Sequence, residues 1–274
     1  TLYTQVSNGE ARAWNFKVDI QGNPTDDVRV AANYTYNRAF DNSTTECCTA
    51  NALLFDTPTA GNPNFLGEPG DSEVGSWGPS KTERRHVFVM NGIWQLPADF
   101  TVSAIYRAQS GNPFTPSVFG DLNFDGDDGN DRPFLPSPGN PAGGGYEFAS
   151  ESDRTAYRQL LGQYDCLQEA VGTIIERNTC RNPWWHSVDL KLKKTFNLTG
   201  DHGFDVILDL FNVLDGLGMG AGEFVFLEDQ IFEVQGYDTD TDRITVETSG
   251  FGRRIPVGFT PFQFQAQLGV QYHF

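Results

Sequence analysis

FQFQAQLGVQYHF, residues 262–274, is the stretch that decides the fold. Every second residue from Phe262 to Phe274 is apolar or aromatic, and the residues between them are glutamine, glycine and histidine. This alternation has the period of a β-strand and not that of a helix. At about 3.3 Å per residue the stretch spans roughly 43 Å, and a tilt near 45° reduces this to about 30 Å, the thickness of a bilayer core. The stretch is therefore long enough to cross a membrane as one strand.

The composition of the chain leaves two fold classes open. Half-buried strands of soluble β-sandwiches show the same alternation, although they are usually shorter. Hydrophobic residues make up 38% of the 274 residues, and the mean hydropathy is −0.41. A run of about 18 apolar residues is absent from the sequence, so we predict no transmembrane helix. These values remain compatible with a membrane barrel, because its strands dilute their apolar residues with polar ones.

The acidic balance of the chain limits its partners. The formal net charge is −17, and a surface that binds nucleic acid needs clustered Lys and Arg. We therefore expect no nucleic acid as partner. The sequence begins at Thr1 without an initiator methionine or a signal peptide, so we expect a mature product or a piece of a longer protein.

Seven segments of the chain, the last one included, alternate in this way. They cover residues 14–20, 28–36, 86–94, 100–109, 186–196, 204–211 and 262–274. Short polar turns join them in pairs at residues 21–26, 96–99 and 198–203. Long irregular segments separate the pairs, at residues 41–84, 110–184 and 212–260. Within the long segments we expect short helices at 152–163 and 166–177, and a hairpin with strands at 223–234 and 243–248.

The asymmetry of these connections carries more information than any one strand. Structureless connections as long as residues 41–84 are uncommon inside a compact soluble domain. Outer-membrane barrels, in contrast, combine tight periplasmic turns with large extracellular loops. We therefore predict an all-β fold, a transmembrane antiparallel β-barrel in the outer membrane of a Gram-negative bacterium. Its loops would be extracellular and its C-terminus periplasmic, with the lipid bilayer around it.

The number of strands indicates that the barrel is larger than this chain. Bacterial single-chain barrels normally have an even number of strands, and seven would leave open edges in lipid. We expect the remaining strands in sequence that lies outside this chain or in another chain. Residues 1–274 would then be the C-terminal part of the barrel.

Several motifs resemble the late barrel of the TonB-dependent receptors, in particular their Oar-like branch. They are YRAQSGNPF at 106–114, DLNFDG at 121–126, NDRP at 130–133, SVDLKLKKTF at 187–196 after Asn182-Pro183, and LFNVLD at 210–215. The resemblance covers most strands from Arg84 onward. It implies a barrel of about 22 strands whose last strands are these seven, with an N-terminal plug outside this chain. It also implies two partners: the TonB complex, through missing N-terminal regions, and the barrel-insertion machinery, which would read Tyr272 and Phe274.

One of these motifs has the spacing of a calcium loop. Hard oxygen ligands at alternate positions converge on Ca²⁺ where a glycine, here Gly126, makes the sharp turn. The twelfth position is Arg132 instead of the usual Glu, which departs from ordinary EF-hand geometry. Calcium as a cofactor and a solvated Asp/Asn-rich turn are both open at this point. The candidate ligands are Asp121, Asn123, Asp125, Asp127 and Asp131.

The cysteines indicate an oxidising compartment. All four lie in predicted extracellular loops: Cys47, Cys48, Cys166 and Cys180. Three pairings are possible. We favour Cys166 with Cys180, at the two ends of a predicted helical segment, with Cys47 and Cys48 as a vicinal disulfide; the alternative is that the loops are cross-linked to each other. Zinc is less favoured because adjacent cysteines lack the usual ligand spacing.

The remaining polar residues do not form a catalytic constellation. GxSxG and HExxH motifs are absent from the sequence, and Gly216–Ala221 is followed by strand-like residues instead of the helix that a dinucleotide fingerprint needs. We therefore do not expect an enzyme. Charged residues of the fifth and sixth strands would face the barrel interior, where they wet the lumen or contact a plug: Asp189, Lys191, Lys193, Asp205 and Asp209.

The function that we expect is transport across the outer membrane. The extracellular loops would capture a large solute for a TonB-energised channel, for uptake or export. The alternative is a barrel-anchored surface scaffold or adhesin with calcium- and disulfide-stiffened loops.

Overall fold

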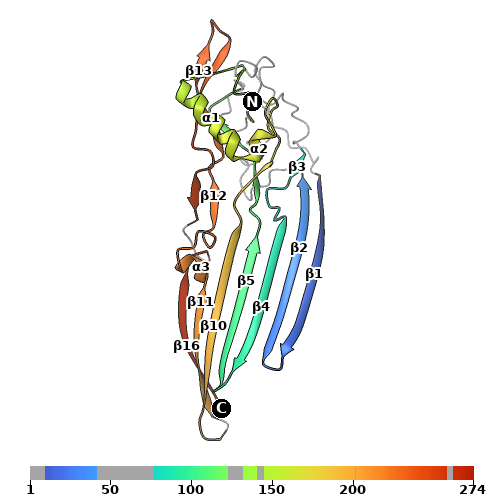
Figure 1. Ribbon diagram of the computed structural model, residues 1–274, viewed down its shortest axis with the longest axis vertical. Helices are drawn as coiled ribbons and strands as arrows, with labels where there is room; N and C mark the ends of the chain where they lie inside the picture. The colour runs from blue at the N-terminus through green and yellow to red at the C-terminus, as the bar shows by residue number, and fades with distance from the viewer. Residues whose placement is uncertain (1–9, 42–76, 123–131, 141–144, 201, 258–261) are drawn as a thin grey trace, which may run out of the picture.

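The computed structural model describes residues 10–41, 77–122, 132–140, 145–200, 202–257 and 262–274, and it has two parts (Figure 1). One part is a sheet of long strands. The other is a smaller folded body at one end of that sheet. We call this body the cap and define it as the described parts of residues 113–181 and 230–251. The opposite end of the sheet is called the short-turn end.

Seven long strands form the large sheet, and all neighbours are antiparallel. In sheet order they are β1 (Ala11–Thr25), β2 (Val28–Asp41), β4 (His86–Leu96), β5 (Phe100–Gln109), β10 (Trp185–Asn197), β11 (Gly203–Phe211) and β16 (Gln265–His273). The two-residue strand β3 (Gly78–Pro79) pairs with the end of β2. Each of the seven alternating segments falls on one of the long strands. Among the described residues, β1 and β16 form the two edges of the sheet and do not pair with each other.

Two strand boundaries differ from the sequence prediction. β1 continues to Thr25, so the turn expected at 21–26 contains only two residues. β16 begins at Gln265, three residues after the predicted start. The backbone N–H of Phe264 donates to the Asp215 carboxylate at 2.8 Å. This contact takes the residue out of the strand ladder.

One face of the large sheet is apolar over its whole width. The register places a row of large apolar side chains across five strands: Trp94, Val102, Leu192, Leu208 and Leu268. Leu268 remains 72% exposed. In the described part of the chain this face therefore has no protein layer over it, which is the arrangement of a lipid-facing surface.

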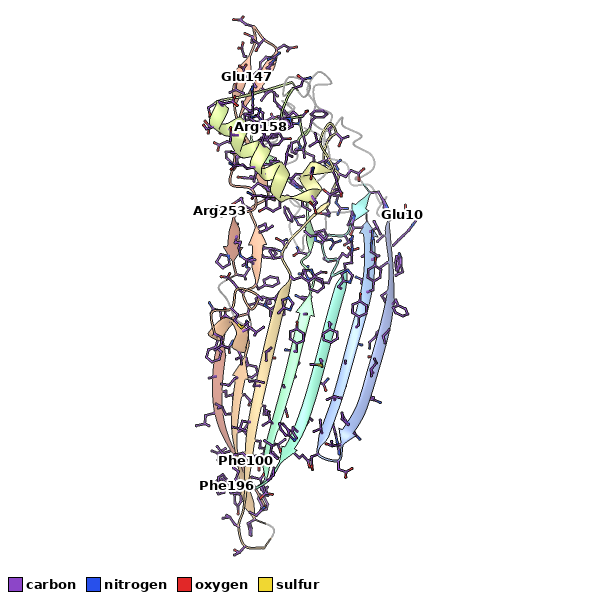
Figure 2. The ribbon with its side chains drawn as sticks, in the orientation of Figure 1. Glu10, Phe100, Glu147, Arg158, Phe196 and Arg253 are labelled. Atoms are coloured by element: carbon purple, nitrogen blue, oxygen red, sulfur yellow. A yellow bond between two sulfur atoms is a disulfide. The ribbon has the colours of Figure 1, made fainter. Side chains whose placement is uncertain are left out.

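Aromatic side chains gather at both ends of the apolar face. Near the cap they are Trp14, Tyr36, His86, Trp184 and His186. At the short-turn end they are Phe100, Phe196, Phe204, Tyr272 and Phe274 (Figure 2). From His186 to Phe196 the strand covers roughly 33 Å, or about 25 Å in height after a tilt near 40°. An apolar band of this height between two aromatic girdles is typical of outer-membrane barrels.

The cap has a sheet and a hydrophobic core of its own. Its four strands have the order β7 (Ser117–Phe119), β13 (Gln230–Asp238), β14 (Arg243–Thr248) and β8 (Tyr146–Phe148). β13 and β14 form a hairpin as predicted, but its first strand covers 230–238 instead of 223–234. β7 and β8 each pair with this hairpin in parallel. Residues from two of the long segments thus fold into one body, whereas the sequence predicted separate loops with short helices and a hairpin.

A helix covers this small sheet. α1 (Glu151–Gln163) begins after Ser150, whose hydroxyl accepts the N–H of Asp153 as an N-cap. Tyr157 is fully buried, and its ring contacts Phe148 and Phe232 with centroids 5.5 and 5.3 Å away. Burial raises the pKa of its hydroxyl, which donates to a backbone carbonyl at 2.9 Å. One aromatic side chain therefore joins the helix to two strands of the cap.

The second predicted helix is mostly wrong. α2 (Asp165–Gln168) is a single turn, whereas a helix was expected over 166–177. Bridges of Val171 with Leu135 and of Ile174 with Phe134 draw the chain out of helical geometry. Tertiary pairing overrides the local helical propensity here.

Short elements connect the cap with the large sheet. β6 (Pro113–Phe114) pairs with β9 (Cys180–Arg181), and β12 (Val225–Leu227) pairs with β15 (Arg254–Pro256). The one-turn helix α3 (Val213–Gly216) follows β11 directly. None of the helices in the described ranges has the length and apolarity needed to cross a membrane.

Candidate functional site

Paired charges lie on the polar face of the large sheet, opposite the apolar face. Lys191 of β10 lies 3.3 Å from the Asp209 carboxylate of β11, its direct cross-strand partner. Lys193 lies 3.5 Å from Asp205, one diagonal step along the ladder. The lysine side chains are 50% and 37% exposed. This face can therefore border water.

The fifth predicted residue of this face, Asp189, organises a partly buried junction. The Arg107 guanidinium of β5 forms an ion pair with its carboxylate. The same carboxylate accepts the backbone N–H of Asn212 at 2.9 Å. Asn212 is 1% exposed and has left-handed backbone geometry with φ of 46°, a conformation that asparagine tolerates better than most residues. The junction fixes the direction in which the chain leaves β11.

The Asn212 side chain extends this junction toward the next segment. Its amide donates to the carbonyls of Gly222 at 2.9 Å and Phe262 at 2.6 Å. The indole of Trp185 donates to the Gly222 carbonyl as well, at 3.1 Å. The sequence marked Asn212 only as the end of a strand motif. Its role depends on residues far away in the chain, so no local signal indicated it.

A concave site lies beside this junction, between α3, the paired strands β12 and β15, and the residues that precede β16. Its volume is about 270 Å³, and it is lined by Asp215, Glu223, Phe224, Pro256, Val257, Phe262, Gln263 and Phe264. The rings of Phe224 and Phe262 stack with centroids 4.3 Å apart. Glu223 lies 3.6 Å from Arg254. The site combines aromatic walls with carboxylates, a lining that suits an apolar solute with a polar or cationic group.

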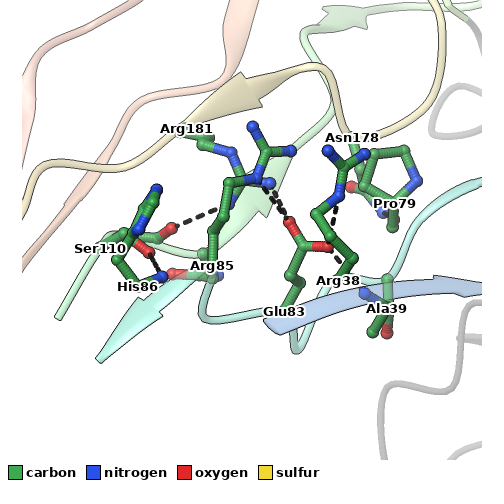
Figure 3. Close-up of polar contacts among 12 residues, drawn as sticks. Arg38, Ala39, Pro79, Glu83, Arg85, His86, Ser110, Asn178 and Arg181 are labelled. Atoms are coloured by element: carbon green, nitrogen blue, oxygen red, sulfur yellow. Dashed lines mark hydrogen bonds and ion pairs between the residues drawn. The ribbon is translucent and has the colours of Figure 1, made fainter. Parts of the chain in front are cut away.

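A buried carboxylate holds the sheet together where β2 ends (Figure 3). Glu83 is 1% exposed. Its carboxylate forms ion pairs with Arg181 and with Arg85 at 3.3 Å, and it lies 3.6 Å from Arg38. This cluster was not predicted from the sequence. The only local signal was the Glu-Arg-Arg run directly before a predicted strand.

The structure contains the disulfide between Cys166 and Cys180, whose Cα atoms lie 5.3 Å apart. It joins α2 to β9 and so closes the segment that carries the bridges of the cap core. Cys47 and Cys48 lie outside the described residues.

The candidate calcium ligands are only partly within the described residues. Asp121 follows β7, whereas Asn123, Asp125, Asp127 and Asp131 lie outside the described ranges. Within those ranges, groups of three or more His, Cys, Asp or Glu side chains arranged for a metal ion do not occur. The calcium loop therefore stays a prediction.

The predicted insertion-signal residues lie at the short-turn end of the apolar face. The hydroxyl of Tyr272 hydrogen-bonds to Nδ1 of His202 at 2.7 Å, and its ring stacks on Phe274. Phe274 is 88% exposed, so its ring is accessible to a partner. Gly216–Ala221, the weak dinucleotide motif, runs through turns from α3 toward β12, and a helix does not follow it.

Comparison with known proteins adds one finding. A family model described as an outer membrane beta barrel domain matches residues 3–220. The matched range contains every long strand except β16. The comparison with curated proteins finds no match for this chain.

Proposed function

This chain belongs to the outer membrane beta barrel domain family, and from that premise we propose that it forms part of a TonB-dependent receptor that captures a solute at the cell surface. Membership of the family places the long sheet in a lipid bilayer. The apolar face between the two aromatic girdles is the surface that contacts lipid, and the polar face lines the interior.

One observation carries the proposal: the long segments fold into a cap with its own core at one end of the sheet. A barrel that only crossed the membrane would need no such body. The concave site beside Asn212 lies between α3 and the paired strands β12 and β15, beyond the end of β11. A solute bound there would be held at the entrance to the interior. The plug, the remaining strands and the TonB contact belong to sequence outside this chain.

The orientation of the cap can be tested on intact cells. The proposal expects Gln159→Cys, on the exposed side of α1, to react with a membrane-impermeant maleimide. Thr199→Cys, in the turn at the opposite end, should react only after the cells are opened. The protein without introduced cysteines is the control. The reverse labelling pattern would refute an extracellular cap.

The transport itself requires a comparison of three strains. They are Gram-negative cells with the full protein, cells without it, and cells with the protein but without TonB. Mass spectrometry follows the solutes that disappear from a complex growth medium. We expect at least one solute to be depleted by the first strain alone. Depletion that persists without TonB would contradict energised uptake.

A second candidate function is a surface scaffold or adhesin. The observation that favours it is the Cys166–Cys180 disulfide, which stiffens the cap. In that case the protein binds a surface equally well with and without TonB, and the three strains deplete the medium to the same extent.

A further inference from the structure

Four arginines gather near one carboxylate where the large sheet meets the cap. Arg38 belongs to β2, Arg84 and Arg85 precede β4, and Arg181 belongs to β9. Figure 3 shows Glu83 among Arg38, Arg85 and Arg181. We call these four arginines the arginine cluster. Four positive charges against one negative charge leave a formal excess of three. This excess is notable in a chain whose net charge is −17.

Both oxygens of the Glu83 carboxylate already have polar partners. One oxygen of Glu83 accepts from Arg85 and Arg181. The other oxygen accepts the backbone N–H of Ala39 and lies 3.6 Å from Arg38. Arg84 is not among the described polar partners of Glu83. The carboxylate therefore compensates only part of the charge around it.

Arg84 is the arginine of the cluster whose positive charge is least compensated by nearby acceptors. Its Nη1 atom is buried, and it finds no hydrogen-bond acceptor among the described residues. Burial, and next the positive charge of Arg181, lower the pKa of Arg84. Burial likewise lowers the pKa of Arg181, where Arg85 and Arg38 add to the effect and Glu83 opposes it. A buried guanidinium group that lacks an acceptor is stabilised when an anion binds to it.

The cluster is accessible, and it lies at the level of the aromatic girdle near the cap. The side chains of Arg38, Arg85 and Arg181 are 26%, 29% and 23% exposed. Arg38 follows Tyr36 by two residues, and Arg84 precedes His86 by two; Tyr36 and His86 are cross-strand partners in the girdle. Aromatic girdles mark the interface between the hydrocarbon layer and the headgroups. The arginines therefore lie at headgroup height.

We propose that the arginine cluster binds a phosphate-bearing group through its uncompensated guanidinium groups, with Arg84 as the central contact. Guanidinium groups bind phosphate oxygens with paired, charge-assisted hydrogen bonds. The phosphate is carried either by a lipid headgroup of the surrounding leaflet or by a soluble anion. This inference does not depend on the transport proposal, because it concerns the rim of the sheet and not its interior.

The test uses the full protein folded in non-ionic detergent without phospholipid. Inorganic phosphate, phosphatidic acid and phosphatidylcholine are titrated separately, and the midpoint of thermal unfolding is followed. Arg84→Gln is the test variant, since it removes a charge that has no carboxylate partner among the described residues. Arg29→Gln, at the other end of the same strand as Arg38, is the matched control.

We expect phosphatidic acid to raise the unfolding midpoint of the wild type and of Arg29→Gln by several degrees, and phosphatidylcholine to have no effect. Arg84→Gln should require at least about tenfold more of the anion for the same shift. A response to phosphatidic acid alone identifies a lipid headgroup, and an equal response to inorganic phosphate identifies a soluble anion. If Arg84→Gln changes the fold by circular dichroism, Arg38→Gln replaces it. An absent shift in the wild type, or an undiminished shift in the cluster variants, overturns the proposal.

Discussion

The Glu83 carboxylate accepts the backbone N–H of Ala39 at 2.8 Å. Two residues earlier, the N–H of Asn37 donates to the carbonyl of Arg85 and so extends the ladder of β2 and β4. If the ladder continued in that register, Ala39 would lie opposite the backbone of Glu83. The chain instead leaves the ladder, and β2 pairs with β3 in a different register. A side chain thus replaces the missing backbone acceptor, which keeps a ladder N–H satisfied at the junction.

Glu83→Gln should destabilise the protein strongly. The amide can still accept from Ala39, but Arg38, Arg85 and Arg181 lose the carboxylate that they share within the described part of the chain. Removing one member of a buried ion pair costs about 3 kcal/mol in the free energy of unfolding. Denaturant unfolding in micelles, followed by tryptophan fluorescence, measures this loss.

Glu151→Gln is the control, because its pairs with Arg154 and Arg158 lie on the surface. Its effect should stay below about 0.5 kcal/mol. Equal effects of both changes would contradict the assigned role of Glu83.

Neighbouring residues of β11 should respond differently to the same substitution. Leu208 lies on the apolar face near the middle of the band, and Ile207 lies on the polar face opposite Lys193. Leu208→Arg should cost about 2–4 kcal/mol in folding into phospholipid vesicles, because it places a charge in hydrocarbon. Ile207→Arg should cost less, since its side chain points to the water-bordered side near Asp205 and Asp209. Urea titrations in vesicles measure both values, and an inverted order would mean that the faces are assigned the wrong way round.

Removal of the disulfide should loosen the cap and leave the large sheet intact. The bridge closes a segment with a sequence separation of 14 residues. For a loop of this size the loss of chain constraint corresponds to about 3 kcal/mol of cap stability. Hydrogen exchange of the double variant Cys166→Ser and Cys180→Ser should therefore accelerate in β13 and β14. Exchange in β10 and β11 is the internal reference, and a uniform acceleration in all four strands would contradict separate stabilities of cap and sheet.

The stability of the cap should fall with rising pH through Asp229, which directly precedes β13 and whose backbone carbonyl accepts the N–H of Ser117 in β7. Burial raises the pKa of this carboxyl above its ordinary value of 3.8, and the charge of Glu228 adds to the effect. The folded cap therefore binds this proton more tightly than the unfolded chain does. The contribution is present below the unfolded pKa and is lost as pH rises through the raised folded pKa. Wild type and Asp229→Asn should be compared at pH 4 and pH 8 by hydrogen exchange in β13. The wild type should lose stability relative to the variant at the higher pH; a relative gain would contradict the raised pKa.

The strands could be predicted closely because their signal is local. In β10 and β11, apolar and polar residues alternate with the two-residue period of a strand, so each face can be identified without knowledge of its neighbours. The ends were less accurate. Phe264 leaves the ladder because Asp215, far away in sequence, accepts its N–H. Most of the helix predicted over 166–177 does not form, because this segment pairs with residues near Leu135 instead.

The sequence by itself determined the all-β class and the positions of the long strands, which depend on periodicity along the chain. It favoured the Cys166–Cys180 pair but left three pairings open, and the structure decided between them. Only the tertiary structure decided that the long segments form a cap and that arginines gather around Glu83. Tyr157 meets Phe232 across two different segments, and Arg181 meets Glu83 from 98 residues away. Such contacts leave no periodic pattern, because their partners are brought together by the fold and not by the spacing of the chain.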